Sequence, residues 1–225
     1  MENQVNHIAI ILDGNRRYAK ARGMPSHKGH EKGAEVVEKL FDWCRELDIK
    51  EVTLYTLSTE NLKRTKKELN YMFNLLKSRF KKLQKDKRIH ENQIKIRFIG
   101  NLSLVPKDVQ KIAKQMEKET KNYNKFRANF CFAYGGRLEL LQAINKLKNK
   151  KGKITEKDVE KALWLSSEPD LIIRTGNRIR TSNFLPWQAA YSEWVFLKKM
   201  WPEFTKADLK KALAEFKKRK RNFGK

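Results

Sequence analysis

Short apolar runs alternate with helical patterns along almost the whole chain. Between these runs, apolar residues recur every three or four positions, which predicts amphipathic helices. Strands that alternate with helices are typical of βαβ units, so the sequence predicts one α/β domain over residues 1–225, with a central, mostly parallel six-stranded sheet flanked by helices. The predicted strands are residues 7–12, 51–57, 94–99, 128–133, 170–173 and 194–197.

The longest helical pattern, over residues 66–90, carries an apolar stripe that is more flexible and aromatic than an ordinary leucine face. Two interpretations stay open: ordinary packing on the sheet, or one wall of an apolar cavity for a long hydrocarbon ligand. Periodicity alone does not separate them. The stripe consists of Leu69, Met72, Phe73, Leu76, Phe80 and Leu83.

Other helix starts are marked by single residues. Pro106 fits the first turn of a helix, because the N–H that it lacks would be unpaired there in any case. Thr155 is followed by acids and bases and is a typical N-cap residue. A C-terminal helix is expected from about Lys206.

The formal net charge of +25 comes from 51 Lys and Arg against 26 Asp and Glu. Such a surface attracts any polyanion: nucleic acid, anionic lipid head groups or phosphorylated substrates. The cations are spread along lysine-rich helices rather than gathered in one block, and an excess of Lys and Glu also accompanies a high growth temperature. Charge alone therefore does not select a partner.

Cysteine usage and hydropathy predict a cytoplasmic protein. Cys44 and Cys131 lie within apolar patterns and lack metal-ligand spacing, so both are expected to be reduced core residues. The sequence contains no apolar run of about 18 residues, so no transmembrane helix is predicted. Residues 1–12 do not follow the plan of a signal peptide.

Three of the predicted strands run into polar clusters: residues 13–17, 58–64 and 174–183. In an open α/β sheet, ligands bind outside the carboxyl ends of the strands, so these clusters can converge on one crevice. In the first cluster, the carboxylate of Asp13 suits Mg²⁺, a glycine follows that allows close backbone approach, and two arginines suit phosphate. The alternative is a plain Asp-Gly turn with arginines that face solvent.

The other two clusters differ in strength. Residues 58–64 could be no more than a helix-capping turn, whereas residues 174–183 hold three arginines beside hydroxyl and amide groups. That composition predicts a second anion pocket. Two anion pockets and one acid indicate transfer between two phosphorylated substrates. The glycine patterns of the common nucleotide-binding loops do not occur.

On these motifs the sequence resembles the cis-prenyltransferases, the group of undecaprenyl and dehydrodolichyl diphosphate synthases. Residues 15–18 and 131–134 look more like the archaeal and eukaryotic branch than the bacterial one. The matching segments cover almost the whole chain in the family's order: residues 7–20, 29–30, 55–61, 133–137, 169–176, 182–185, 187–188 and 201–202, with Arg64, Arg180 and Glu193.

The resemblance implies a Mg²⁺-dependent prenyltransferase, with helices that enclose an apolar tunnel. Such an enzyme condenses isopentenyl diphosphate sequentially onto an allylic primer, farnesyl or geranylgeranyl diphosphate. Each cycle adds a cis double bond, and the product is a long-chain precursor of a lipid carrier. The resemblance also implies a homodimer without nucleic acid, and the basic surface suggests peripheral association with the cytoplasmic membrane face. A lid-like loop is expected around residues 61–68.

The resemblance assigns roles to individual residues. Asp13 and Asn61 are the implied catalytic residues, and Asp13 and Glu193 the implied metal ligands, the latter across a dimer interface. The implied residues for isopentenyl diphosphate are Arg174, Arg180 and Ser182. The implied residues for the allylic diphosphate are Gly14, Asn15, Arg16, Arg17, Tyr18, Ser26, His30, Ser58 and Arg64.

Three positions depart from the family's pattern. Ser26 stands where an arginine is usual, so that His27, Lys28 or another cation has to compensate. Asn177 follows Gly176 in place of a loop that ends in a carboxylate. The C-terminal Arg-x-Gly pattern, which reaches a neighbouring subunit's site, becomes residues 222–224, with Arg221 as a substitute in a shifted register.

Two other functions are compatible with parts of the sequence. A non-catalytic partner subunit of a heteromeric prenyltransferase would tend to lose the acid and the strand-end arginines, which this chain keeps. A basic RNA-binding module would need aromatic platforms on an exposed sheet face, whereas the strands here look buried on both sides.

Overall fold

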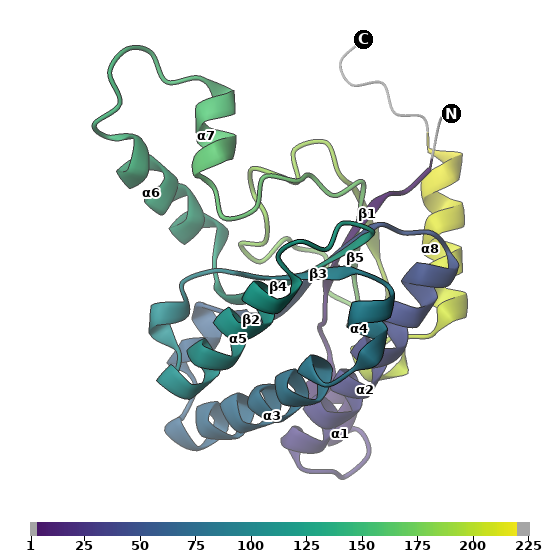
Figure 1. Cartoon of the computed structure of the whole chain (residues 1–225). Coiled ribbons are helices and arrows are strands. Elements are labelled where there is room, and N and C mark those ends of the chain that lie inside the picture. Colours follow the sequence, from purple (N-terminus) through teal and green to yellow (C-terminus); the bar gives the residue numbers. More distant parts are fainter. Residues whose placement is uncertain (1–3, 220–225) are drawn as a thin grey trace.

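The computed structural model describes residues 4–219 (Figure 1). Within this range, a six-stranded sheet has the strand order β3-β4-β2-β1-β5-β6, and every neighbouring pair is parallel. The predicted α/β class is confirmed, and the sheet is parallel throughout. The strands are β1 (His7–Ile11), β2 (Glu51–Ser58), β3 (Ile94–Ile99), β4 (Phe126–Tyr134), β5 (Leu171–Arg174) and β6 (Glu193–Phe196).

The central strands are covered on both faces. All five residues of β1 and all four of β5 are buried, as continuous apolar runs in a parallel sheet require. The chain leaves β1 towards β2 on one side, and later leaves β5 towards β6 on the other. The strand order therefore reverses between β1 and β5, and this switch point is where open α/β sheets bind ligands.

Helices pack on the sheet and on one another (Figure 1). α2 contacts both α1 and α3, α3 contacts α5, and α6 contacts α7, a pair that projects from the rest of the domain. The helices are α1 (Asn15–Lys20), α2 (Ser26–Glu46), α3 (Lys66–Gln84), α4 (Lys87–Glu91), α5 (Lys107–Thr120), α6 (Gly136–Leu147), α7 (Glu156–Ala162) and α8 (Lys206–Lys218), with short 3₁₀ turns η1 (Glu60–Lys63), η2 (Leu102–Leu104) and η3 (Trp201–Glu203).

The predicted helix starts are confirmed. Thr155 forms a capping box with Asp158 at the start of α7, and Pro106 precedes the first residue of α5. The single helix expected over residues 66–90 is wrong. α3 ends at Gln84 and α4 begins at Lys87, because the Asp86 carboxylate accepts a hydrogen bond from the Arg88 amide and so caps a new helix.

The core confirms the interpretation of both cysteines, which are free and buried. Among the described residues, no helix is long and apolar enough to span a membrane. The larger core cluster lies on the face of the sheet that α2, α3 and α5 cover, and it includes Leu40, Phe80 and Met116. Part of the predicted stripe on α3 joins this core, where Phe80 packs edge-on against Phe98.

Candidate active site

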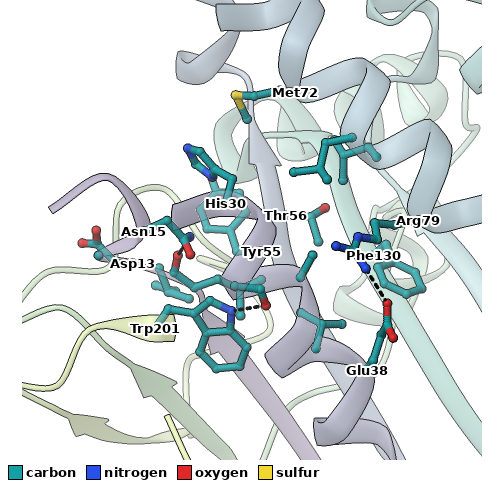
Figure 2. A pocket seen from close by; sticks show the side chains of 18 of the residues that line it. Asp13, Asn15, His30, Glu38, Tyr55, Thr56, Met72, Arg79, Phe130 and Trp201 are labelled. Atoms are coloured by element: carbon teal, nitrogen blue, oxygen red, sulfur yellow. Dashed lines mark hydrogen bonds and ion pairs between the residues drawn. The ribbon is translucent and has the colours of Figure 1, made fainter. Parts of the chain in front are cut away.

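A cavity of about 1280 Å³ begins at the carboxyl ends of β1, β2 and β5 and extends between the sheet and the helices α2 and α3 (Figure 2). Asp13 and Asn15 lie at one end, which we call the near end. Phe130 and Arg79 lie away from them. The apolar walls between are formed by Val37, Phe41, Met72, Leu75, Leu76, Phe80, Leu83 and Phe130.

Residues of the stripe on α3 both line the cavity and pack on the sheet. Met72, Leu76, Phe80 and Leu83 line the cavity. Phe80 also packs on the sheet. A wall made of such residues suits a hydrocarbon chain.

Asp13 follows β1 and lies between two arginines. Its Oδ1 is 3.0 Å from Nη2 of Arg17, and its Oδ2 is 2.9 Å from Nη2 of Arg174. Its main-chain oxygen accepts hydrogen bonds from the Thr175 hydroxyl and the Trp201 amide, which fix the turn. The carboxylate is only a quarter exposed, so its two ion pairs lie at the wall of the cavity.

Gly14 is needed by the geometry of this turn. Its φ is +111°, a value that side chains rarely adopt, and a Cβ atom there would come within 2.7 Å of the Met200 sulfur. Helix α1 begins directly afterwards, which the sequence did not predict. No apolar stripe marks α1, because only Ala19 of its six residues is buried.

Arg174 is the most deeply buried cation of the site, with 4% of its side chain exposed. Its Nη1 donates to the Ser182 hydroxyl at 2.7 Å and to the main-chain oxygen of Arg180 at 2.5 Å. Its Nε is buried and has no partner among the described residues. Ser182 and Asn183 both have positive φ, so the loop is held in a conformation typical of functional sites.

His30 and Asn15 place unpaired polar atoms in the same region. Nε2 of His30 and Oδ1 of Asn15 are buried without a hydrogen-bond partner in the described part of the chain. Burial, helped by the nearby Arg64 and Arg16 guanidinium groups and opposed by Glu68, lowers the pKa of His30 to about 4. His30 is therefore neutral at pH 7.

The cluster after β2 is a capping turn that also lines the cavity. The Asn61 amide donates to the Ser58 hydroxyl at 3.1 Å, and Oδ1 of Asn61 accepts from the Ser58 amide at 3.2 Å. Arg64 donates to Glu68 at 3.0 Å and contacts the sulfur of Met72 at 3.2 Å. Of the segment expected to form a lid, residues 60–63 are a 3₁₀ turn and α3 begins at Lys66.

Most of the expected site residues line this one cavity, but Tyr18 and Glu193 do not. Instead the guanidinium of Arg22 stacks on the Tyr18 ring at 3.9 Å. The expected site residues that line the cavity are Asp13, Gly14, Asn15, Arg16, Arg17, Ser26, His30, Ser58, Asn61, Arg64, Arg174, Arg180 and Ser182.

The cations proposed to compensate for Ser26 are engaged elsewhere. The ring of His27 lies 4.8 Å from that of Tyr71, and Lys28 pairs with Glu31 at 2.9 Å. Lys20 on α1, by contrast, lines the cavity, as does Ser26 on α2.

The structure does not bring Glu193 to Asp13 within one chain. Glu193 is the first residue of β6, whereas Asp13 lies two residues beyond the end of β1. Because the strands are parallel, these two positions lie at opposite ends of the strands. Glu193 pairs instead with Arg219 at 2.7 Å. Among the described residues, no group of three or more His, Cys, Asp or Glu side chains is placed to hold a metal ion.

Two departures from the family's pattern remain, at Asn177 and at residues 221–224. The Asn177 amide donates to the main-chain oxygen of Leu197, and its φ is +53°. Arg221 and residues 222–224 lie outside the described residues.

Sequence reasoning missed the charged residues at the other end of the cavity. Glu38 on α2 and Arg79 on α3 pair across it at 2.9 Å (Figure 2). The two residues are 41 positions apart, and in isolation each is an ordinary charge on the polar face of an amphipathic helix. The two residues meet at the cavity only because α2 packs against α3.

The comparisons with known proteins agree with this geometry. The sequence profile of the family described as "Putative undecaprenyl diphosphate synthase" matches residues 11–224. The chain is 42% identical to a protein of Thermoplasma volcanium named "Tritrans,polycis-undecaprenyl-diphosphate synthase (geranylgeranyl-diphosphate specific)", over 97% of this chain and 88% of that one. A protein of the same name from Methanocaldococcus jannaschii is also 42% identical, over 100% and 84% of the two chains.

Two solved structures extend the comparison. Lavandulyl diphosphate synthase from Lavandula x intermedia, crystallised with dimethylallyl diphosphate, superimposes with a TM-score of 0.94 at 31% identity over the whole of both chains. A probable undecaprenyl diphosphate synthase from Campylobacter jejuni gives a TM-score of 0.85 at 32% identity, over 99% of this chain and all of that one.

A parallel α/β sheet with an acid and arginines at its switch point, above an apolar cavity, defines an enzyme of the prenyltransferase class. The chain belongs to the cis-prenyltransferase family, that of the undecaprenyl diphosphate synthases.

Proposed function

We propose that this protein is a Mg²⁺-dependent cis-polyprenyl diphosphate synthase that extends geranylgeranyl diphosphate with isopentenyl diphosphate units. One observation carries the proposal: a single cavity joins the Asp13–Arg174 pair to a long apolar wall. An anionic head group at the near end and a hydrocarbon tail along α3 would both be matched. The names of the archaeal relatives favour geranylgeranyl diphosphate as the primer.

The two anion pockets would hold the two substrates. Arg16, Arg17 and Arg64 face the near end and would hold the allylic diphosphate, beside the Gly14 amide. Charge develops on this diphosphate as the allylic C–O bond breaks, so fixed arginines there would lower the barrier. The unpaired Nε2 of His30 is buried in the same region and could meet a diphosphate oxygen.

The second pocket would hold isopentenyl diphosphate. Arg174 has an unpaired Nε and donates through Nη1 to the Ser182 hydroxyl, and the Arg180 side chain also lines the cavity. Because Arg174 also pairs with Asp13, the two pockets share one wall, which would bring the two substrates together.

The residues at the near end fit a magnesium ion with few protein ligands. Mg²⁺ is commonly bound by one or two carboxylates together with substrate phosphates, and the cavity offers the Asp13 carboxylate beside the proposed diphosphate pocket. When bound, the ion would neutralise charge on the leaving diphosphate. Asp13 would exchange an arginine contact for the metal, and Asn61 would support the centre from the capping turn after β2.

A homodimer would account for Glu193. Its distance from Asp13 along the strands means that it could join a metal site only as the residue of a second copy. The exposed face of α6 offers a surface for association, since Leu141 and Ile144 are 57% and 63% exposed. The net charge of +25 would favour contact with an anionic membrane surface, into which the product partitions.

The test is a condensation assay with purified protein, labelled isopentenyl diphosphate, Mg²⁺ and primers of C10, C15 or C20 length. The products are separated by chain length. We expect elongation, with the highest kcat/KM for the C20 primer. Failure to extend any primer would refute the proposal and favour a non-catalytic partner subunit. β1 and β5 are buried along their whole length and β4 over residues 128–134, so these strands offer no exposed face for the RNA-binding alternative.

A further inference from the structure

The cavity ends in charged side chains contributed by α2, α3, α4 and the links beside them. We call these residues the far-end cluster. Its members are Glu38, Asp42, Arg45, Arg79, Lys82, Asp86 and Arg88.

The position of this cluster follows from the direction of α2. The helix begins at Ser26, which lines the near end, and it rises about 1.5 Å per residue, so Glu38 lies about 18 Å further along its axis. Ile94 at the start of β3 also lines the cavity, which places this end at the amino edge of the sheet. The cluster therefore lies at the end opposite Asp13.

The pairing within the cluster ties α2 to α3. Oε1 of Glu38 is 2.9 Å from Arg79 and Oε2 is 2.6 Å from Lys82, so both carboxylate oxygens are engaged. Although burial opposes the change, the contacts with Lys82 and Arg79 lower the pKa of Glu38, which is charged at neutral pH. Glu38 and Arg79 are each about 30% exposed, whereas Lys82 is mostly in solvent.

Apolar side chains line the cavity beside this pair, and Phe41 and Leu83 lie about one turn further along α2 and α3 than Glu38 and Arg79. Phe41, Leu83 and Phe130 line the cavity together with Glu38 and Arg79. A hydrocarbon that advances along this wall gains free energy from each group that it buries. At the pair this gain is opposed, because an apolar group that passes it has to strip water from two charges and offers them no hydrogen bond.

We propose that the Glu38–Arg79 pair is a length-determining stop for the growing chain, and that it acts through its charge rather than through its bulk. The proposal rests on the proposed function and names the residues that limit its product. A pair of charges is not needed to hold two helices together here, since a packed apolar pair of similar volume usually does so equally well.

The test replaces both residues with methionine, which is similar in length but uncharged. In the condensation assay, Glu38→Met with Arg79→Met should shift the product distribution to longer chains by at least one C5 unit. The charge-swapped variant, Glu38→Arg with Arg79→Glu, restores an ion pair and should return the wild-type length. A matched control is Lys77→Met with Asp108→Met, which removes an ion pair between α3 and α5 outside the cavity.

Unchanged product lengths in the methionine variant would overturn the proposal, because they would show that space alone sets the limit. Longer products in the charge-swapped variant would overturn it as well. If the methionine variant does not fold, Glu38→Gln with Arg79→Gln removes both charges at similar side-chain size, and it should still lengthen the product.

A binding series separates this inference from the proposed function. Calorimetry with n-alkyl diphosphates of increasing length requires no condensation. In the wild type, affinity should rise roughly fourfold per added methylene and then level off where the tail meets the pair. In the methionine variant the rise should continue to longer tails. A protein that condenses no substrate but shows this difference would refute the proposed function and support the stop.

Discussion

At its near end the cavity is lined by six cationic side chains and two acids, whereas at its far end four cations face three acids. Both ends use the same kinds of residue. At the near end several polar atoms are left without partners, namely Nε of Arg174, Nε2 of His30 and Oδ1 of Asn15. At the far end both oxygens of Glu38 are engaged.

This difference shows that charge balance, rather than residue type, separates a site that receives an anion from one that closes a cavity. An excess of cations with unpaired donors has a favourable interaction left to make with a diphosphate. Charges that neutralise one another have none, and they can only repel an apolar chain. Four variants test this contrast.

The largest effect is expected from Asp13→Asn at the near end. The change keeps the size of the side chain and removes the charge between Arg17 and Arg174, so kcat should fall roughly 10³-fold, as when a transition-state contact is lost. Steady-state kinetics measure kcat, and a thermal unfolding curve shows whether the variant folds. Glu35→Gln on α2, which pairs with Lys32 outside the cavity, is the control. A well-folded Asp13→Asn enzyme with near wild-type turnover would show that the metal and diphosphate lie elsewhere.

The second-largest effect is the loss of folding stability at acid pH that is linked to His30. Because its folded pKa of about 4 lies below the unfolded value of 6.5, the native state resists its protonation. The stability linked to neutral His30 is complete above pH 6.5 and is lost as the pH falls towards 4. The full loss is about 3 kcal/mol.

Urea unfolding at several pH values between 7 and 4 measures this loss. The His30→Gln variant should lose less stability over this range than the wild type, by up to that amount. His90→Gln, at an exposed position on α4, should behave like the wild type. Identical acid slopes for His30→Gln and the wild type would mean that the ring is solvated in the folded state.

Arg174→Lys should have a smaller effect, confined to one substrate. Lysine keeps the charge but lacks the planar fork that reaches Asp13 and Ser182 from two separate nitrogens and leaves Nε for a diphosphate, so KM for isopentenyl diphosphate should rise roughly 10- to 100-fold. KM for the allylic primer should change far less. Arg127→Lys is the matched control, since Arg127 pairs with buried Glu51 at the opposite edge of the sheet. Equal changes in both KM values would contradict the division into two pockets.

The smallest effect is expected from Lys82→Ala at the far end. Lys82 is 64% exposed and Glu38 retains Arg79, so the free energy of unfolding should fall by less than about 1 kcal/mol. Product length should not change. A shift in product length from this variant alone would transfer the role of the stop from Arg79 to the solvent-exposed lysine.

The sequence was sufficient wherever the signal is local. Apolar runs predicted every strand, and Thr155 and Pro106 marked the starts of α7 and α5. The strand-end rule brought residues from three distant segments to one cavity, because all the strands are parallel.

The errors have physical causes. The apolar period continues across residues 85–86, so it could not detect that Asp86 caps a new helix there. The Glu38–Arg79 pair depends on how α2 packs against α3, which no spacing within either helix encodes. Tyr18 belongs to the motif that predicted the diphosphate site, but it does not line the cavity, and Arg22 on the adjoining turn covers its ring.

The contact between Asp13 and Arg174 joins residues that are 161 positions apart. A ribosome that adds about 5–20 residues per second needs on the order of ten seconds or more between the two. During that time β1 can pair with β2, but its other edge has to wait for β5. The nascent chain therefore exposes an apolar strand edge, open to wrong partners, until the same segment that completes the sheet also completes the site.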